Sequence, residues 1–439
     1  MVKRLSLVVF LCAVLGPRAV AQTLVNVCPY RPAHSTSLAC LIPDLTQTGQ
    51  SQNLARFNTT IAQVLGQLPL AAPVSGFVLG FDKKLGIPVE ESQNLGSVLT
   101  ERGNTVGRHK LFLGFTYQRF VFQTIDGTKL SSLPSAYFIQ TVPGTSIQEY
   151  GISNNSLGAN LSQYTGIVAF GLTDRIDVSL TVPYERVSLS AGNSNVQQAF
   201  VSNGVSSVSN VQAGQNIAGS AHGVGDLLFN MKGTVFNGEK SKIALGMEAR
   251  FPTGDEFNLL GTGAYGVKPY VVFSRLGRIT PHLNLGYQWN DFSDLYINSC
   301  YFNGACTANL TGLPTLRLPD SLDYSAGADI GVVKKFTVVA DFVGQHYFNA
   351  PRVTPAVPLS QANIPGMPIP GSSAQVAAFN NAKTVGVATG SIDVNNVAAG
   401  IKWNPTGRLI LSANALIRLD TGGLRPNRFV PLVGISYRF

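Results

Sequence analysis

From about residue 108 to the end of the chain, apolar and polar positions alternate in one segment after another. Within 242–253, for example, Leu245 and Met247 alternate with Gly246 and Glu248. Successive side chains of a β-strand point to opposite faces, so each segment predicts a strand with one apolar face and one polar or small face. The pattern fits a barrel with lipid outside and water inside, and it also fits a soluble β-sandwich.

The connections between these segments distinguish the two folds. The predicted strands are 108–124, 163–173, 175–189, 224–236, 242–252, 264–275, 278–290, 321–333, 335–348, 391–403, 408–420 and 428–439. Short connections such as 174–175 and 237–241 alternate with long polar ones at 124–162, 191–223, 291–320 and 349–390. Short periplasmic turns and long outer loops are typical of outer-membrane barrels. We therefore predict an all-β fold: a transmembrane antiparallel up-and-down β-barrel of about 12 strands, surrounded by lipid in the bacterial cell outer membrane.

The two ends of the chain carry the features of export and assembly. A basic start, a mostly apolar stretch at 5–16 and a small-residue motif ending at Ala21 predict a signal peptide at 1–21. At the other end, an alternating strand runs up to Tyr437 and Phe439. A last strand of this kind resembles the signal read by the barrel assembly machinery, and we predict that role for these two residues.

Residues 22–107 differ from the barrel at 108–439. Phe57, Ile61 and Leu65 follow helical spacing and predict an amphipathic helix. We expect a partly helical, plug-like region inside the barrel. A periplasmic extension, or two further strands that would make the barrel fourteen-stranded, remain alternatives.

Charge and cysteine content limit the classes of partner and of site that we expect. The chain has 32 basic and 23 acidic residues, and its net charge of +9 is scattered. Nucleic-acid binding needs a clustered basic surface, so no nucleic-acid partner is expected. An exported protein meets oxidising conditions, and two close pairs without the C-x-x-C spacing of a metal site favour disulfides. The disulfide candidates are Cys28, Cys40, Cys300 and Cys306. No metal and no cofactor are predicted.

Aromatic residues gather near the ends of the predicted strands, where interfacial girdles form. The girdle candidates are Phe120, Phe122, Tyr184, Tyr265, Tyr287, Trp289, Tyr347, Phe348, Trp403 and Tyr437.

The inward phase of the strands predicts a charged lumen. The lumen-lining candidates are Lys232, Glu248, Arg250, Lys268, His282, Arg418 and Arg438. Charges at a constriction select solutes, whereas charges that pair with one another only line the wall. The acidic residues that share the inward phase favour pairing; these are Asp226, Asp323, Asp329 and Asp341.

Three short stretches, at 170–179, 223–228 and 251–255, carry a resemblance to a known family. Their sequences FGLTDRIDVS, GVGDLL and FPTGD, in this order, resemble outer-membrane proteins of the "MetA-pathway of phenol degradation" family, distant relatives of the long-chain fatty-acid channel. The resemblance implies a barrel that admits hydrophobic or aromatic compounds. No ligand-pocket residue can be carried over from it.

These observations predict a channel for the passive uptake of small, hydrophobic or aromatic solutes, and no enzyme activity. One alternative is a surface adhesin or structural protein that acts through its long loops. A less favoured alternative is an outer-membrane lipid hydrolase with His346 as the base. A hydrolase needs a nucleophile within hydrogen-bond reach of that base, and no serine shares the predicted strand face.

Overall fold

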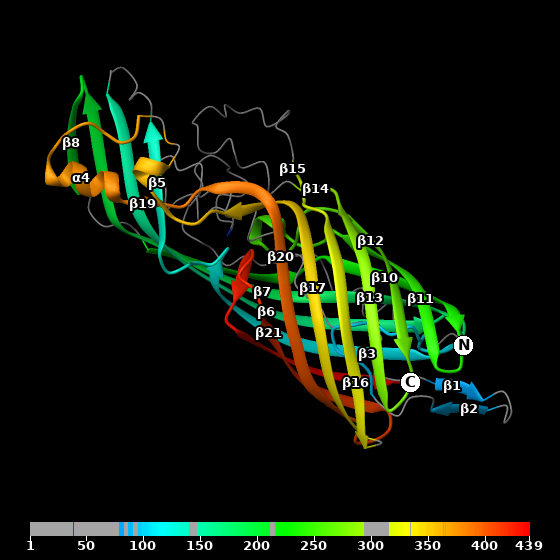
Figure 1. The fold of residues 1–439 in the computed structure, drawn as a ribbon. Helices are drawn as coiled ribbons and strands as arrows, with labels where there is room; N and C mark the ends of the chain where they lie inside the picture. Colours follow the sequence, from blue (N-terminus) through cyan, green and yellow to red (C-terminus); the bar gives the residue numbers. More distant parts are fainter. Residues whose placement is uncertain are drawn as a thin grey trace.

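The computed structural model describes residues 38, 79–82, 87–90, 95–139, 147–210, 216–293, 316–333, 335–362, 364 and 366–439. The predicted signal peptide, the predicted N-terminal helix and the four cysteines lie outside these residues. A short hairpin of β1 (Leu79–Asp82) and β2 (Ile87–Glu90) precedes the barrel (Figure 1). None of the helices in the described part of the chain is long and apolar enough to cross a membrane.

Twelve antiparallel strands form one closed barrel (Figure 1). They are β3 (Leu111–Ile125), β6 (Gln148–Gly171), β7 (Ile176–Ser202), β10 (Leu227–Asn237), β11 (Ser241–Phe251), β12 (Gly266–Arg275), β13 (Ile279–Asn290), β16 (Ser321–Val333), β17 (Phe336–Val353), β20 (Val387–Trp403), β21 (Leu409–Arg418) and β23 (Phe429–Arg438). The last strand pairs with the first, from Arg438 opposite Phe112 to Leu432 opposite Gln118. A closed ring leaves no sheet edge in lipid, and the predicted 12-stranded barrel is confirmed.

The remaining short elements lie mostly in the outer connections. They are β4 (Thr128–Lys129), β5 (Leu133–Ile139), β8 (Val205–Asn210), β9 (Asn216–Val224), β14 (Phe292–Ser293), β15 (Leu316–Arg317), β18 (Val357–Pro358), β19 (Lys383–Thr384), β22 (Leu424–Pro426), η3 (Glu256–Asn258), η5 (Leu359–Gln361) and α4 (Ala374–Asn381). The turns between β6 and β7, β10 and β11, β12 and β13, β16 and β17, and β20 and β21 are short and lie at the other end of the barrel, which we call the short-turn end.

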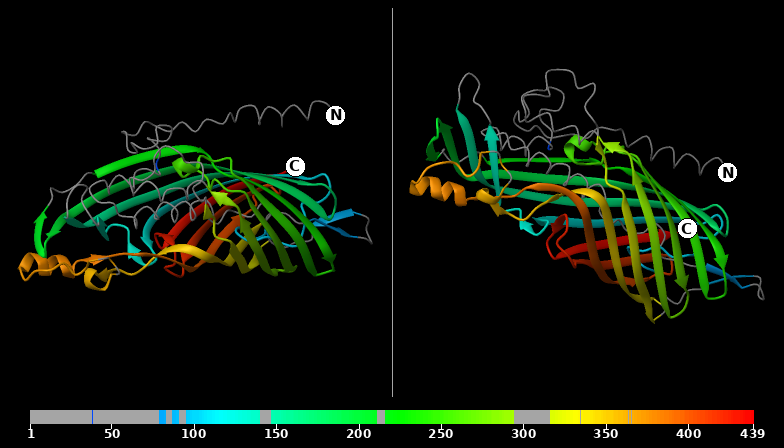
Figure 2. Two further views of the ribbon diagram at one scale, coloured as in Figure 1. Left: turned by 90° about the horizontal axis from the view of Figure 1, so that it is seen from above. Right: turned by 45° about the horizontal axis from the view of Figure 1, so that its top comes forward.

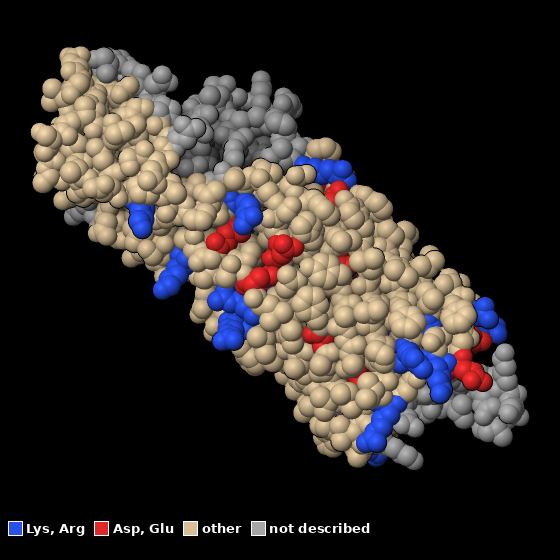
Figure 3. Space-filling model, viewed as in Figure 1, with Lys and Arg blue, Asp and Glu red and all other residues tan. Residues whose placement is uncertain are grey.

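The outer surface of the barrel is apolar. Phe115 is 46% exposed, Leu245 53% and Leu283 54%, while the lumen-facing neighbours Ala244 and His282 are buried. Figure 3 shows a broad face with few charged side chains between charged groups toward each end. This is the exterior of an outer-membrane barrel, whose lipid-facing band is bounded by more polar ends.

Aromatic rings mark the two limits of the apolar band. Toward the outer end, opposite the short turns, the rings of Tyr117 and Tyr164 lie 4.9 Å apart and those of Tyr164 and Tyr184 6.5 Å apart. At the short-turn end, the rings of Tyr437 and Phe439 lie 4.7 Å apart. Both arrangements are typical of interfacial girdles.

The prediction of a girdle position is wrong for three residues. Phe120, Phe122 and Tyr347 are 1%, 4% and 3% exposed and face the lumen. They share the strand phase of inward residues, and phase rather than aromatic character decides the side on which a strand residue points.

The predicted loops at 124–162 and 191–223 are also wrong in extent. β6 and β7 continue beyond the membrane as strands of 24 and 27 residues. With β5, β8 and α4 they form an outer lobe, which we call the wing (Figures 1 and 2). The wing has its own apolar core, made of Ala136, Tyr150, Ile152, Ala199, Val201, Leu359, Ile369, Val376 and Phe379. These segments lie outside lipid and alternate small with polar residues, so their sequence lacks the contrast that reveals a membrane strand.

Candidate functional site

A buried segment crosses the lumen at the short-turn end. Residues 95–107, which we call the strap, immediately precede the first barrel strand, and 95–98 and 100–106 are buried. The backbone amide of Leu95 donates to the Thr337 hydroxyl on β17, at 2.8 Å. At the other end of the strap, the amide of Val106 donates to the Asp177 carboxylate on β7, at 3.0 Å. The strap therefore spans the barrel from one wall to the other.

Two ion pairs hold the centre of the strap. Arg102 donates to Asp329 on β16 through Nε and Nη2, at 3.0 and 2.6 Å. Lys232 on β10 lies 2.5 Å from the Glu101 carboxylate. Burial raises the pKa of Glu101, and the Lys232 ammonium opposes that shift. Breaking one partner of a buried pair typically costs about 3–5 kcal/mol, because the other charge is left uncompensated.

A third anchor forms around Asp341 on β17. Its carboxylate accepts from the Thr100 hydroxyl at 3.2 Å and contacts His282 Nε2 at 2.9 Å. His282 Nδ1 lies 3.5 Å from Asp329, so the imidazole lies between the two carboxylates that hold the strap. Lys402 on β20 adds hydrogen bonds to strap carbonyl oxygens, including that of Ser97.

The strap lies directly against the barrel wall. Gly103 donates its amide to the Ser274 hydroxyl at 3.1 Å and accepts from the Thr234 hydroxyl at 2.6 Å. A Cβ at Gly103 would lie 2.9 Å from the Lys242 carbonyl oxygen. This approach of two backbones is possible because glycine has no side chain.

The other predicted lumen residues form separate groups. Lys268 contacts Glu248 at 2.9 Å and Asp323 at 3.4 Å, which joins β11, β12 and β16. Arg250 donates to Asn290 at 2.7 Å and lies 3.8 Å from Asp226.

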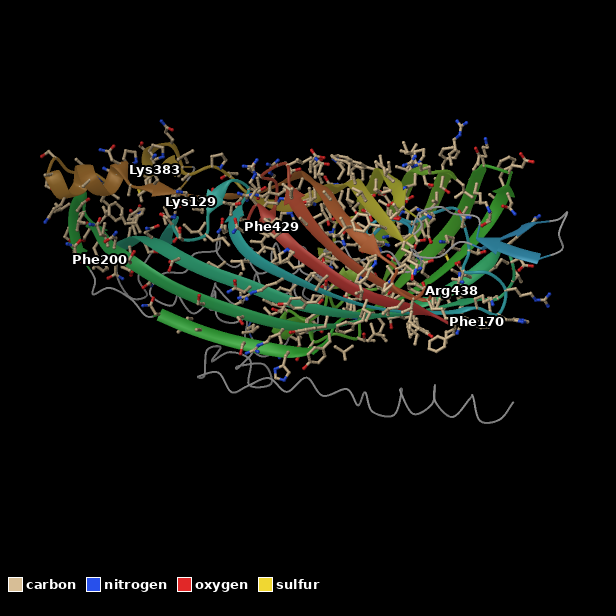
Figure 4. The ribbon with its side chains drawn as sticks, turned by 90° about the horizontal axis from the view of Figure 1, so that it is seen from below. Lys129, Phe170, Phe200, Lys383, Phe429 and Arg438 are labelled. Atoms are coloured by element: carbon tan, nitrogen blue, oxygen red, sulfur yellow. The ribbon has the colours of Figure 1, made fainter. Side chains whose placement is uncertain are left out.

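Neither terminal arginine candidate joins these groups. Arg418 donates to the Thr124 hydroxyl at 2.9 Å, toward the outer end of the barrel. Arg438 is half-buried on the last strand, at the short-turn end near Phe170 (Figure 4). The structure thus brings together Glu248 and Lys268, and it places Lys232 and His282 at the strap.

One side of the lumen is apolar above the strap. Side chains from β3, β6, β7, β9, β20, β21 and β23 make a continuous buried cluster; its wall members include Phe120, Phe122, Leu157, Leu161, Val187, Leu189, Ala221, Ala398, Leu416 and Val430. Leu259 and Leu260, from the connection between β11 and β12, pack against this wall. Leu38 belongs to the same cluster, and its amide donates to the Asn258 side chain at 3.3 Å.

The opposite side of the lumen is polar. Tyr270 on β12 donates to Asn230 on β10 at 2.8 Å, next to the Lys268 group. The lumen therefore has an apolar wall and a polar wall that face each other, with the strap across the short-turn end.

Sequence reasoning missed the strap and the apolar wall. The strap carries no periodic signal, and its partners on the barrel wall lie far away along the chain, at separations such as 71 for Val106 and Asp177 and 131 for Glu101 and Lys232. The apolar wall did leave a signal, because Leu161, Leu189 and Leu416 occupy inward positions where a water-filled lumen would favour polar residues.

His346 lies on the outer surface of β17. Its Nδ1 contacts the exposed Asp393 carboxylate at 2.7 Å, and its ring lies 4.7 Å from that of Phe348. Among the hydrogen bonds of the described residues, none joins His346 to a serine hydroxyl. The His346–Asp393 pair resembles the interfacial residues around it and not a hydrolase site.

A family model matches the central part of the chain. Residues 141–309 match the family described as "Putative MetA-pathway of phenol degradation". The resemblance predicted from the three short stretches is confirmed. No curated protein matches the chain.

Solved structures with similar folds are outer-membrane proteins. An outer membrane channel from Pseudomonas putida F1 is 12% identical, with 77% of this chain and 99% of that chain covered and a TM-score of 0.43. The CymD monoaromatic hydrocarbon channel is 7% identical, covers 76% and 89%, and gives a TM-score of 0.33. A Pseudomonas aeruginosa FadL homologue is 9% identical, covers 75% and 88%, and gives 0.26. At these identities none of them transfers a residue role to this chain.

Proposed function

We propose that this protein is a passive outer-membrane channel for small hydrophobic or aromatic compounds. The observation that carries the proposal is the apolar wall inside a closed barrel. A general porin has a polar, water-filled lumen, whereas aliphatic and aromatic side chains give an apolar solute about 25 cal/mol of favourable transfer free energy per Å² of surface removed from water. The match of residues 141–309 to a family described by phenol degradation supports the same solute class.

The strap would set the closed state of this channel. It crosses the short-turn end, where ion pairs and hydroxyls hold its centre and small apolar contacts, such as that of Val98 with Val339 and Leu432, add to them. Polar anchors of this kind can exchange their partners for water when the strap moves, so the proposal includes release of the strap as the opening step.

Uptake by whole cells tests the proposed solute class. We expect cells that express the protein to take up radiolabelled toluene, at low external concentration, several-fold faster than cells with an empty vector. Uptake of radiolabelled arabinose should stay unchanged, because a sugar gains nothing from an apolar wall and loses hydration on it. Equal acceleration of both solutes would show a general porin and contradict the proposal.

A further inference from the structure

A row of basic side chains crosses the outside of the barrel, just beyond the aromatic girdle. Arg119 on β3 is opposite Ser162 on β6, and Ser162 is opposite Arg186 on β7. Arg186 is in turn opposite His222 on β9. Both arginines are exposed, while their neighbours along the strands point into the lumen.

The rows on either side fix the level of this basic row in the membrane. One step toward the short-turn end, Tyr117, Tyr164 and Tyr184 stand opposite one another. One step the other way, Val121, Asn160 and Ser188 stand opposite one another, on the side toward the wing. Apolar, aromatic, basic and mainly polar rows follow one another in this order, which places the arginines at the outer headgroup level. Figure 4 shows the direction of these levels on the last strand, which runs between Arg438 at the short-turn end and Phe429, nearer the wing.

Within the described part of the chain, the arginines of this row have no acidic partner. Among the described residues, no carboxylate forms an ion pair with Arg119 or Arg186. Two other exposed arginines at the outer end do have such partners: Arg317 has Asp320 at 3.6 Å and Arg352 has Asp126 at 3.8 Å. Two uncompensated cations beside a low-dielectric layer favour an anion from outside the protein.

The spacing suits a phosphate group. Adjacent strands lie about 4.8 Å apart, so the backbones of Arg119 and Arg186 are about 10 Å apart with Ser162 between them. Two long guanidinium side chains can converge over the small serine, and the forked guanidinium is the side chain that best matches phosphate oxygens. The tyrosines below supply an apolar surface for acyl chains, and their hydroxyls lie at the headgroup level.

We propose that Arg119, Ser162 and Arg186 form a binding site for the phosphate of a phosphorylated glycolipid in the outer leaflet, the lipid A type. The level of the row selects a lipid over a soluble anion, because the ligand must offer a phosphate and acyl chains at once. The polar surface above the row, with Asn160 and Ser188, suits a sugar headgroup rather than a small one.

Binding of purified lipids to the full-length protein in detergent tests this site. The probes are diphosphoryl lipid A, the same lipid after phosphatase treatment, and phosphatidylglycerol, measured by native mass spectrometry and by titration. We expect the wild-type protein to retain diphosphoryl lipid A and to bind it at least about tenfold more tightly than the other two lipids, since charge-assisted contacts are lost with the phosphate. The double variant Arg119→Gln/Arg186→Gln should lose this preference.

The matched control removes two arginines at the short-turn end. Arg175 and Arg275 are exposed there, and Arg175→Gln/Arg275→Gln changes the net charge equally. This control should bind diphosphoryl lipid A like the wild type. Equal binding by both double variants would overturn the site, and equally tight binding of phosphatidylglycerol would overturn its assignment to a glycolipid. Heat-modifiable migration on gels checks that each barrel is folded. Both double variants should take up toluene at the wild-type rate.

Discussion

The double variant Glu101→Gln/Arg102→Gln is expected to raise the single-channel conductance of the barrel at least about threefold in planar bilayers. The change removes both charged side chains by which the strap holds Lys232 and Asp329. Each wall charge would then stay buried without its strap partner, at a cost of about 3–5 kcal/mol for a broken buried pair, unless the strap moves and water reaches it. The released state is therefore expected to become populated.

A matched pair at the surface controls for the change in charge. Glu239 and Lys240 are exposed in the turn between β10 and β11, so Glu239→Gln/Lys240→Gln should conduct like the wild type. Gly103→Val should also release the strap, because a side chain at this position collides with the Lys242 backbone. If both strap variants stay as silent as the wild type while the barrels remain folded, the strap does not close the channel.

The second large effect concerns the apolar wall. Leu161→Asn/Leu189→Asn is expected to lower toluene uptake by whole cells at least about tenfold, since buried amides raise the cost of placing an apolar solute beside them. Both leucines are buried on neighbouring strands, 0% and 2% exposed, and face the lumen. The measurement is the initial uptake rate at equal amounts of folded protein in the outer membrane.

Its control adds the same amides to a polar part of the same strands. Thr165 on β6 and Thr181 on β7 are buried lumen residues in the polar region, so Thr165→Asn/Thr181→Asn should keep more than half of the uptake, about the effect expected of a polar-for-polar change. An uptake rate that falls equally in both variants would mean that lumen size, and not wall polarity, determines the flux.

The membrane part of the fold could be predicted because lipid imposes contrast on every strand. Residues such as Leu245 and Met247 must face hydrocarbon, and their neighbours must not. That contrast identified all twelve strands and the short turns between them. The contrast ends where lipid ends, which is why the sequence pattern predicts loops for the outer parts of β6 and β7.

The contents of the lumen could not be predicted in the same way. Nothing near Arg102 in the sequence points to Asp329, which lies 227 residues away and meets it only when the barrel closes. The inward phase did identify Lys232 and His282, but it gave no partner for either. The prediction that the whole of 22–107 plugs the barrel stays a prediction, because most of that region lies outside the described residues.

The ladder between β6 and β7 has one irregularity, between Ile152 and Asn154, where the wing begins. An extra residue in one strand bends it and increases its twist, so this position acts as a corner. In Figure 1 the wing strands rise at an angle to the barrel strands. A large particle that approaches the cell, such as a phage or an antibody, therefore meets the flank of the wing before the mouth of the barrel. Two residues of β7, Asn195 and Val196, oppose one of β6 here, and removal of Asn195 would straighten the corner and turn the outermost face of the protein without changing any residue of the apolar wall.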